Sequence, residues 1–433
     1  MISDIYTEFL KNPFISTDTR KIVPNSIFFC LKGENYDGNQ FVNQAFQMGA
    51  KCVVTENSRY TDNPNCFVVK DVLETLQILA TNHRLELKIP VIGITGTNGK
   101  TTTKELITAV LSQKYKVTAT VGNLNNHIGV PLSLLSINED TEIAVIEMGA
   151  NHPNEIAELC KIAYPTHGVI TNIGSAHLEG FKTFENIIET KMGLYNSVIV
   201  ENGILFVNGK DLLLVKEAKT RIEEFQKKWG ANNAKIQFFN VQQDPFINGK
   251  VIDINPYLTL EIFNRVLKTH LTGIYNLENI LCAAAIGKYF DVSEEQILKA
   301  IEDYIPSNNR SQVVKIGNNT IIADYYNANP TSMKAALDNF AGIKHKNKIA
   351  VIGDMFELGD FSVMEHEKVI ELCKEYKIET YFIGTHFFDL KNDSTHFFQS
   401  TQDFIPTFKN LQLNETMILV KGSRGVHLED IFK

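Results

Sequence analysis

The segment from residue 93 to residue 104 has residue types and spacing that suit the binding of phosphate groups. It reads Gly-Ile-Thr-Gly-Thr-Asn-Gly-Lys-Thr-Thr-Thr-Lys. The two later glycines let backbone N–H groups approach an anion closely, Lys100 can reach terminal phosphates, and the Thr101 hydroxyl can bind Mg²⁺. The spacing Gly-x-x-Gly-Lys-Thr is shorter than that of a standard P-loop, because position 94 is Ile and not Gly. The alternative is an ordinary strand-to-helix turn with a surface lysine.

A predicted strand before this segment and a predicted helix after it would place it at the edge of a sheet. Residues 89–94 form an apolar run that predicts a buried strand, and residues 101–112 have the pattern of a helix. A glycine-rich turn between the two would direct a phosphate to the helix N-terminus, where the helix dipole favours negative charge. The segment therefore predicts a nucleotide-binding site.

Two further strands end in polar residues on the same expected edge. The apolar run 143–148 contains Glu147 near its end, and the run 168–173 is followed by His177. Since ligands of open α/β sheets bind at the carboxyl ends of the strands, Glu147 is a candidate Mg²⁺ ligand. Its alternative is a carboxylate that caps the helix after Pro153. For His177, a metal ligand and an ordinary loop histidine both stay open.

Other polar residues have simpler interpretations on the sequence alone. Lys191 lies in a mostly apolar helical stretch and is expected to be a solvated or snorkelling lysine. Asn276 and Asn279 stand at the start of an alanine-rich helix, 276–290, where amide side chains normally cap. Three strands near the C-terminus are followed by the polar segments 324–330, 353–357 and 421–424, which suggests a second ligand-binding face.

The length of 433 residues suggests about three domains. We expect an α/β fold with a small N-terminal α/β domain (residues 1–87), a central P-loop domain with a mostly parallel sheet (88–305) and a C-terminal Rossmann-like α/β domain (306–433). The pattern of the central and last domains, strands alternating with helices, is typical of parallel sheets. Period-two segments at 235–239 and 257–263, on either side of Asn248-Gly249, predict an antiparallel hairpin. Residues 306–309 are the predicted linker.

Composition excludes several classes of partner. The net charge of −8, with both signs interspersed, provides no basic surface for nucleic acid or anionic lipid. The six cysteines have no Cys-x-x-Cys spacing, so neither a disulfide framework nor a zinc site is indicated. No apolar run reaches the length of a membrane span. We expect a cytoplasmic monomer that binds small molecules.

The chain resembles the Mur ligases along essentially its whole length. The resemblance rests on motifs in all three blocks: Asp18-Thr19-Arg20, Asp37-Gly38, residues 96–102, 122–131, 147–151, 172–177, 327–333, 353–359 and 421–424. Tyr326-Asn327-Ala328-Asn329 is the most discriminating of them. Members that add the third peptide residue carry Tyr-Ala-His near this point, with an Asp-Asn-Pro motif in the last domain, and neither is present here.

This resemblance implies an ATP- and Mg²⁺-dependent ligase. The discriminating motif points to the members that join D-alanyl-D-alanine to UDP-N-acetylmuramoyl-tripeptide through an acyl phosphate. ATP contacts are implied at Gly96, Thr97, Asn98, Gly99, Lys100, Thr101, Thr102, Asn276, Asn279, Arg310 and Asp324. Metal ligands are implied at Thr101, Glu147, His177 and a carbamate on Lys191, and the catalytic set is Lys100, Glu147, His177 and Lys191. Substrate contacts are implied at Thr19, Arg20, Asn123, Asn126, Tyr326, Asn327, Asn329, Asp354 and Lys421.

Two positions depart from the family pattern, and two other functions stay as alternatives. Many relatives have His where this chain has Tyr275, and Glu is frequent where it has Gly193. The first alternative is a ligase for another acceptor, such as a folylpolyglutamate synthase, which shares the cradle. The second is a nucleotide-dependent switch without catalysis. The motifs do not specify whether the tripeptide ends in diaminopimelate or in lysine.

Overall fold

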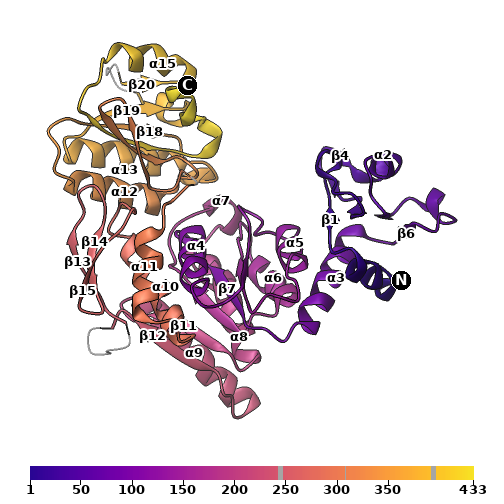
Figure 1. Cartoon of the computed structure of the whole chain (residues 1–433). Helices are drawn as coiled ribbons and strands as arrows, with labels where there is room; N and C mark the ends of the chain where they lie inside the picture. Colours follow the sequence, from indigo (N-terminus) through magenta and orange to yellow (C-terminus); the bar gives the residue numbers. More distant parts are fainter. Residues whose placement is uncertain (242–246, 308, 392–395) are drawn as a thin grey trace.

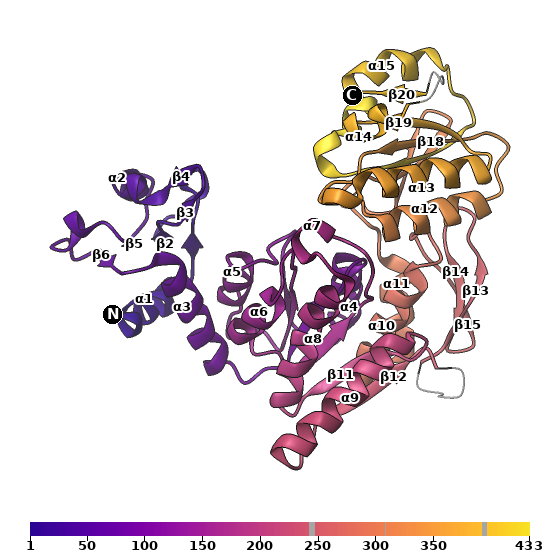
Figure 2. The same cartoon turned by 180° about the vertical axis from the view of Figure 1, so that it is seen from behind.

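The chain folds into three α/β domains. The computed structural model describes residues 1–241, 247–307, 309–391 and 396–433. The N-terminal and C-terminal domains lie on opposite sides of the central domain in both views (Figure 1 and Figure 2). The expected fold class is confirmed, since each domain has its own mostly parallel sheet. In the described ranges, no helix is both long enough and apolar enough to cross a bilayer.

The N-terminal domain is built on a short parallel sheet with the strand order β1-β2-β5-β6. Residues 26–31 and 52–55 contain β2 and β5, and residues 38–47 form a 3₁₀ turn followed by α2. The strands are β1 (Ile15–Ser16), β2 (Ile27–Phe29), β5 (Cys52–Thr55) and β6 (Cys66–Val68), with a small hairpin of β3 (Lys32–Gly33) and β4 (Tyr36–Asp37). The helices are α1 (Ile2–Lys11), α2 (Val42–Gln47) and α3 (Val72–Glu86).

Helix α3 joins the first domain to the second. It packs against α1 and also against α5 (Gly129–Leu135) and α6 (Glu155–Ala163) of the central domain. Near its C-terminal end, the Arg84 guanidinium is buried and donates to the carbonyls of Ala163 and Tyr164, at 3.0 and 2.9 Å. Hydrogen bonds between a charged donor and buried carbonyls are among the stronger ones in proteins. The helix that ends the first predicted domain is thus held firmly to the central one.

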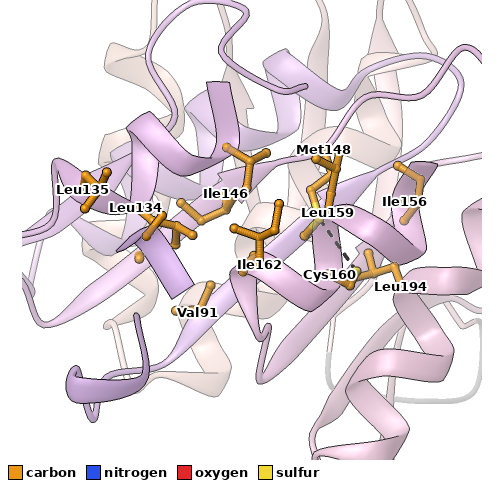
Figure 3. Close-up of a cluster of buried hydrophobic side chains, with 14 of the residues drawn as sticks. Val91, Leu134, Leu135, Ile146, Met148, Ile156, Leu159, Cys160, Ile162 and Leu194 are labelled. Atoms are coloured by element: carbon orange, nitrogen blue, oxygen red, sulfur yellow. Dashed lines mark hydrogen bonds between the residues drawn. The ribbon is translucent and has the colours of Figure 1, made fainter. Parts of the chain in front are cut away.

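The central sheet has the order β12-β11-β10-β7-β9-β8, and all its neighbours are parallel. Because side chains alternate along a strand, Val91 enters one core with α5, α6 and α8, while Ile92 enters another with α4, α10 and α11. Figure 3 shows the first core, where Ile146, Met148 and Leu159 meet. The strands are β7 (Val91–Thr95), β8 (Val117–Ala119), β9 (Ile143–Glu147), β10 (His167–Ile170), β11 (Ile204–Asn208) and β12 (Lys235–Phe239). The remaining helices are α4 (Lys100–Leu111), α7 (Leu178–Phe181), α8 (Phe184–Val200), α9 (Leu212–Trp229), α10 (Asn276–Tyr289) and α11 (Glu294–Asp303).

The predicted hairpin is only partly present. Strand β12 is the edge strand of the parallel sheet, paired with β11, and is not half of a hairpin. The antiparallel unit is instead a three-stranded sheet of β13 (Gly249–Asp253), β14 (Thr259–Ile262) and β15 (Arg265–Lys268). The error has a physical cause, because a half-buried edge strand shows the same period-two pattern in a parallel and in an antiparallel sheet.

The C-terminal sheet has the order β16-β17-β21-β18-β19-β20. Its pairings are parallel except at β16, an antiparallel edge strand that the sequence analysis did not identify. The strands are β16 (Gln312–Ile316), β17 (Asn319–Asp324), β18 (Lys348–Gly353), β19 (Glu379–Ile383), β20 (Phe397–Phe398) and β21 (Met417–Lys421). Helices α12 (Pro330–Gly342), α13 (Ser362–Glu375) and α14 (Thr385–Asp389) cover one face, and α15 (Thr401–Asn410) covers the other. The predicted linker includes Asn308, which lies outside the described residues.

Candidate active site

The glycine-rich turn between β7 and α4 has the backbone of an anion cradle. Gly96 and Gly99 have φ of +145° and +79°, a region that L side chains rarely adopt. A Cβ on Gly96 would lie 1.9 Å from the Thr171 hydroxyl oxygen. No side chain caps the N-terminus of α4, so the backbone N–H groups of its first turn point outward without an intrahelical partner. The turn can therefore receive phosphate oxygens.

We expect Gly96→Ala to weaken ATP binding by about tenfold or more, since the added Cβ must displace Thr171 and the backbone is strained. Calorimetric titration of ATP would measure this loss. Gly317→Ala is the matched control, because Gly317 also has a positive φ, of +58°, but has open space around its Cβ position. Equal ATP affinity in both variants would contradict the importance of the close approach.

The loop after β10 braces the cradle from one side. The backbone N–H of Asn98 donates to the Asn172 side-chain oxygen at 3.0 Å, and the amide of Asn172 donates back to the Asn98 carbonyl at 3.1 Å. The Thr171 hydroxyl donates to the same carbonyl at 2.6 Å. These bonds fix the turn before any ligand arrives, which lowers the entropy cost of binding. Thr171 was not identified from the sequence, because a polar side chain just past a strand is common in this fold.

Lys100 lies across the cradle. Its ammonium donates to the carbonyls of Gly96 and Thr97, at 2.8 and 3.0 Å. Loss of contact with water lowers the pKa of Lys100 to about 8, although the charge of Glu147 acts in the opposite direction. The ammonium is therefore held where the phosphates of a nucleotide would lie. When a nucleotide binds, the ammonium could donate to the phosphate oxygens instead of to the two carbonyls.

This pKa predicts proton uptake when ATP binds above neutral pH. A polyphosphate favours the ammonium form of Lys100, so ATP binding should raise its pKa from about 8, and affinity for ATP should fall as the pH rises through that value. Calorimetry at about pH 8.5 in two buffers of different ionisation enthalpy should detect uptake of a large fraction of one proton. Lys100→Arg, which stays charged, should show none of this uptake. Equal heats in both buffers for the unmodified protein would contradict the prediction.

Glu147 meets Thr101 beside the cradle. Its carboxylate accepts from the Thr101 hydroxyl at 2.9 Å and from the Asn125 amide at 2.8 Å, and its side chain is buried. The alternative role of Glu147 as a helix cap is wrong. The backbone N–H groups of Asn151 and His152, just before α6, donate to the carboxylate of Glu155 instead. Asn125 lies in one of the motifs, but its contact with Glu147 could not be read from the sequence.

The Thr101 and Glu147 oxygens fit Mg²⁺. They are hard donors close enough to share one ion, and Mg²⁺ commonly takes one or two protein ligands and completes its shell with phosphate oxygens and water. Among the described residues there is no group of three or more His, Cys, Asp or Glu side chains arranged to hold a metal. The protein thus offers a partial site of the kind that a nucleotide completes.

His177 lies at the rim of the site and faces the C-terminal domain. Its backbone is left-handed, with φ of +51°, and its Nδ1 atom contacts the carboxylate of Glu357. This contact holds the pKa of Glu357 below its usual range. Glu357, which the sequence analysis did not single out, also has a left-handed backbone, with φ of +61°. Strained backbone on both sides of one contact is typical of functional positions.

Lys191 is buried in α8, which corrects the expectation of a solvated lysine. Burial, together with the charge of Lys100, holds the pKa of Lys191 well below its usual range. Its side chain does not line the cavity described below. The helical pattern could not reveal this burial, because α8 packs between the sheet and its neighbours α6 and α9.

The asparagines of α10 form a chain of amides that leads to α4. Asn276 donates to the Thr272 carbonyl at 2.7 Å, Asn279 donates to the Asn276 side-chain oxygen at 2.7 Å, and the Thr103 hydroxyl donates to Asn279 at 3.0 Å. Neither is a side-chain cap of the helix, whose N-cap is Tyr275. The capping interpretation is therefore wrong, and these amides line the wall of the site.

The C-terminal domain closes the other side. Asp324 accepts from the ammonium of buried Lys421 at 2.7 Å and from the backbone N–H of Ser311 at 3.1 Å. The guanidinium of Arg310 stacks on the Tyr326 ring, 3.8 Å from its centre, and its buried Nε atom has no partner in the described chain. Such a group is placed to receive an anion.

A direct hydrogen bond joins the C-terminal domain to the cradle. The Asn329 amide donates to the Asn98 side-chain oxygen at 2.8 Å. Asn329 is itself fixed as the N-cap of α12, where it accepts from the backbone N–H of Ser332. The nucleotide cradle and the third domain thus share one polar surface.

All three domains line a single cavity of about 1160 Å³. The N-terminal domain contributes α3 residues, among them Gln77 and Ile78. Most of the predicted site residues line it: Thr97, Asn98, Gly99, Lys100, Thr102, Asn123, Asn126, Glu147, His177, Asn276, Asn279, Arg310, Asp324, Tyr326, Asn327, Asn329 and Lys421. Gly96 and Thr101 lie in the cradle beneath its surface.

Besides Lys191, the structure does not bring three predicted residues, Thr19, Arg20 and Asp354, to this cavity. Thr19 and Arg20 lie on a 3₁₀ turn of the N-terminal domain, where the exposed guanidinium pairs with Asp18. Asp354 is buried, and its carboxylate accepts from the backbone N–H groups of His386 and Phe387 at the start of α14. The proposed substrate contact of Asp354 is thus not supported, because a carboxylate after a strand can serve a neighbouring helix instead.

Comparison with known proteins identifies the family. Three stretches match family models, the Mur ligase family catalytic domain at 13–95, the Mur ligase middle domain at 94–287 and the Mur ligase glutamate ligase domain at 309–424. The chain is 34% identical over 432 residues to UDP-N-acetylmuramoyl-tripeptide--D-alanyl-D-alanine ligase of Bacillus subtilis (strain 168), covering 97% of this chain and 92% of the relative.

Solved structures agree with this result. The fold matches a crystal structure of MurF from Acinetobacter baumannii with a TM-score of 0.85 and 29% identity, over 96% of this chain and 92% of that one. It matches MurF ligase from Thermotoga maritima in complex with ADP with a TM-score of 0.79 and 28% identity, over 96% of each chain. A folylpolyglutamate synthase from Thermotoga maritima is more distant, with a TM-score of 0.55 and 14% identity over 82% of this chain and 90% of that one, which indicates a shared fold alone. The chain therefore belongs to the Mur ligase family.

Proposed function

We propose that this protein is an ATP-dependent, ADP-forming ligase that joins D-alanyl-D-alanine to UDP-N-acetylmuramoyl-tripeptide and so makes the pentapeptide precursor of peptidoglycan. The observation that carries the proposal is the single cavity in which the cradle of the central domain faces the polar strand ends of the C-terminal domain. An enzyme that activates one substrate with ATP and then joins it to a second needs such a shared chamber. The relatives named for this reaction are similar along nearly the whole chain.

The reaction must activate a carboxylate before an amine can attack it. The terminal carboxylate of the tripeptide attacks the γ-phosphorus of ATP, forming an acyl phosphate while ADP leaves. Bound Mg²⁺ would neutralise part of the phosphate charge. Lys100, across the cradle, would hold the transferred phosphoryl group and reduce the repulsion between the two anions. The amine of the dipeptide then attacks the acyl carbon, and phosphate leaves.

The other residues would position the nucleotide and metal. Thr101 and Glu147 would hold Mg²⁺, while Lys191, as a carbamate, and His177 are the proposed ligands of a second ion. Asn276 and Asn279 would face the adenine, and Arg310 and Asp324 would close over the nucleotide from the third domain. The contact between Asn98 and Asn329 crosses the same domain boundary and would help to exclude water during transfer.

The three domains then have separate tasks. The N-terminal domain, with Thr19 and Arg20, would bind the UDP-sugar, the central domain ATP, and the C-terminal domain the incoming dipeptide. A folylpolyglutamate synthase is the weaker alternative, because the separate N-terminal domain has no clear role with a folate. A switch without catalysis is also weaker, since Lys100, Thr101 and Glu147 are present and correctly grouped.

The test is a phosphate-release assay. The purified protein would be incubated with ATP, Mg²⁺, UDP-N-acetylmuramoyl-tripeptide and D-alanyl-D-alanine, and each component would be omitted in turn. We expect phosphate release only when both the UDP-tripeptide and the dipeptide are present. Comparing the rates with tripeptides that end in diaminopimelate and in lysine would then identify the preferred third residue. Release with a folate and glutamate instead would favour the other ligase class, and ATP binding with no release under any condition would favour the switch.

A further inference from the structure

A second, smaller cavity adjoins the large one, and the mechanism above places no ligand in it. Its volume is about 190 Å³, and it lies between the loop that leads into α7 and three strand-end loops of the C-terminal domain. His177, Asn327 and Asn329 line both cavities, so the small one opens toward the cradle. Its remaining wall includes Phe356 and Arg424. A space of this size cannot hold a nucleotide but can hold a molecule of a few small residues.

The wall of the small cavity is a built structure. The buried Ser423 hydroxyl accepts from the backbone N–H of Phe356 at 3.0 Å, and the Ser423 backbone N–H donates to the Asp354 carbonyl at 3.0 Å. The next residue, Met355, donates its N–H to the ring of fully buried His366 at 3.1 Å. The loops after β18 and β21 are therefore fixed to one another and to α13. A ligand would find this wall preorganised.

The charges along the cavity suit a molecule with a carboxylate at one end and an amine at the other. Arg424 lies on one side of the cavity, and among the described residues its guanidinium makes no ion pair with a carboxylate. Its guanidinium carbon lies 5.7 Å from the centre of the Tyr326 ring, on which Arg310 of the nucleotide site also stacks. Glu357, in contact with His177, supplies a carboxylate that can accept from an amine. An unpaired guanidinium beside a fixed wall is suited to bind a carboxylate through two parallel hydrogen bonds.

We infer that Arg424 is the residue that selects the incoming dipeptide, by binding its C-terminal carboxylate in the small cavity while the amine faces His177 and the cradle. The inference rests on the proposed function. It adds where the dipeptide binds and which side chain recognises it. In this orientation the amine points through the shared wall toward the large cavity, where the acyl phosphate would form. The carboxylate, which takes no part in the reaction, is then what holds the nucleophile in place.

The test compares D-alanyl-D-alanine with its C-terminal amide, D-alanyl-D-alaninamide, which keeps the nucleophilic amine but lacks the charge. The unmodified protein should prefer the acid by roughly 10- to 100-fold in kcat/KM, because a charge-assisted bidentate pair is lost with the amide. Arg424→Ala should abolish this preference by raising KM for the acid, with KM for ATP and for the UDP-tripeptide unchanged. Arg424→Lys should restore part of it.

Two further variants make the result specific. Arg265→Ala removes an exposed guanidinium from β15, outside both cavities, and should keep the full preference for the acid. Gly425→Ala keeps Arg424 but places a Cβ 2.8 Å from the Phe356 ring, so it should raise KM for the acid and the amide alike.

The outcomes separate the inference from the proposed function. If the unmodified protein ligates D-alanyl-D-alanine but Arg424→Ala keeps the preference for the acid, the inference is overturned and the proposed function stands. A normal KM for the dipeptide in Gly425→Ala would likewise overturn the placement in the small cavity. If the unmodified protein does not ligate the dipeptide at all, the proposed function fails, and the inference fails with it.

Discussion

Lys100→Ala is expected to lower ligation by at least about 10³-fold, because the variant loses the ammonium that, in the proposed mechanism, would neutralise the transferred phosphoryl group. The fold should be retained, since within the described part of the chain this ammonium donates to carbonyls of its own turn, those of Gly96 and Thr97. The measurement is phosphate release with both acceptors present, together with circular dichroism and thermal unfolding to check the fold. Lys100→Arg should recover part of the ATP affinity but little of the rate, because a planar guanidinium cannot occupy the site of a compact ammonium.

Lys114→Ala is the matched control for this loss. Lys114 is an exposed lysine just past the end of the same helix, α4, and lies outside the cavity. We expect it to ligate at the rate of the unmodified protein. Turnover that survives in Lys100→Ala would remove Lys100 from the catalytic set and would favour a different binding mode for the phosphates.

The second large effect is expected at Lys191. Burial and the charge of Lys100 lower the pKa of this amine, which favours its neutral form, the form that can attack CO₂. The attack forms an N–C bond and releases a proton, and the product is a carbamate with two oxygen donors for a cation. Lys191→Ala should therefore lose about 10²-fold or more of the ligation rate, as expected for loss of a metal ligand.

The carbamate itself has a direct readout. Protein equilibrated with ¹³C-labelled bicarbonate should show one carbamate resonance that is absent in Lys191→Ala and present in Lys216→Ala, a variant of an exposed lysine on α9. Protein held without CO₂ should lose activity and recover it when bicarbonate is added. A rate that does not depend on CO₂, with no labelled resonance, would leave Lys191 as a structural lysine.

Recognition of the cradle needed only local sequence. Two glycines with positive φ, a strand before them and a helix after them are properties of consecutive residues, and the structure has them close to the predicted positions. The capping box of Ser293 and Gln296, which begins α11, is local in the same sense. Alternation of strands and helices also predicted the three α/β domains, because parallel strands need a crossover between them.

Which segments meet was decided only by the tertiary structure. The periodic pattern of residues 235–239 shows a half-buried strand, but it carries no information about the partner, and the partner is the parallel strand β11. Likewise, residues 353–357 were correctly recognised as a polar strand end, but Asp354 turns to α14 while Glu357 meets His177. Residue type and spacing could not distinguish the two carboxylates, because the difference lies in elements far away in the chain.

The chemical state of a side chain also depends on distant residues. The sequence identified Lys100 and Glu147 because strand-to-helix turns and strand ends mark such positions by themselves. It misjudged Lys191 as solvated, and it placed Arg424 in the polar strand end 421–424 without a specific role. Burial of Lys191 comes from the packing of α8 against the sheet and two other helices, and the place of Arg424 comes from four loops that meet at a domain boundary. The sequence alone thus determined the phosphate cradle and the order of elements. Only packing between segments distant in the chain decided the burial and the pKa of Lys191 and the shape of the second cavity. Each of these depends on many contacts between distant residues, which no local pattern encodes.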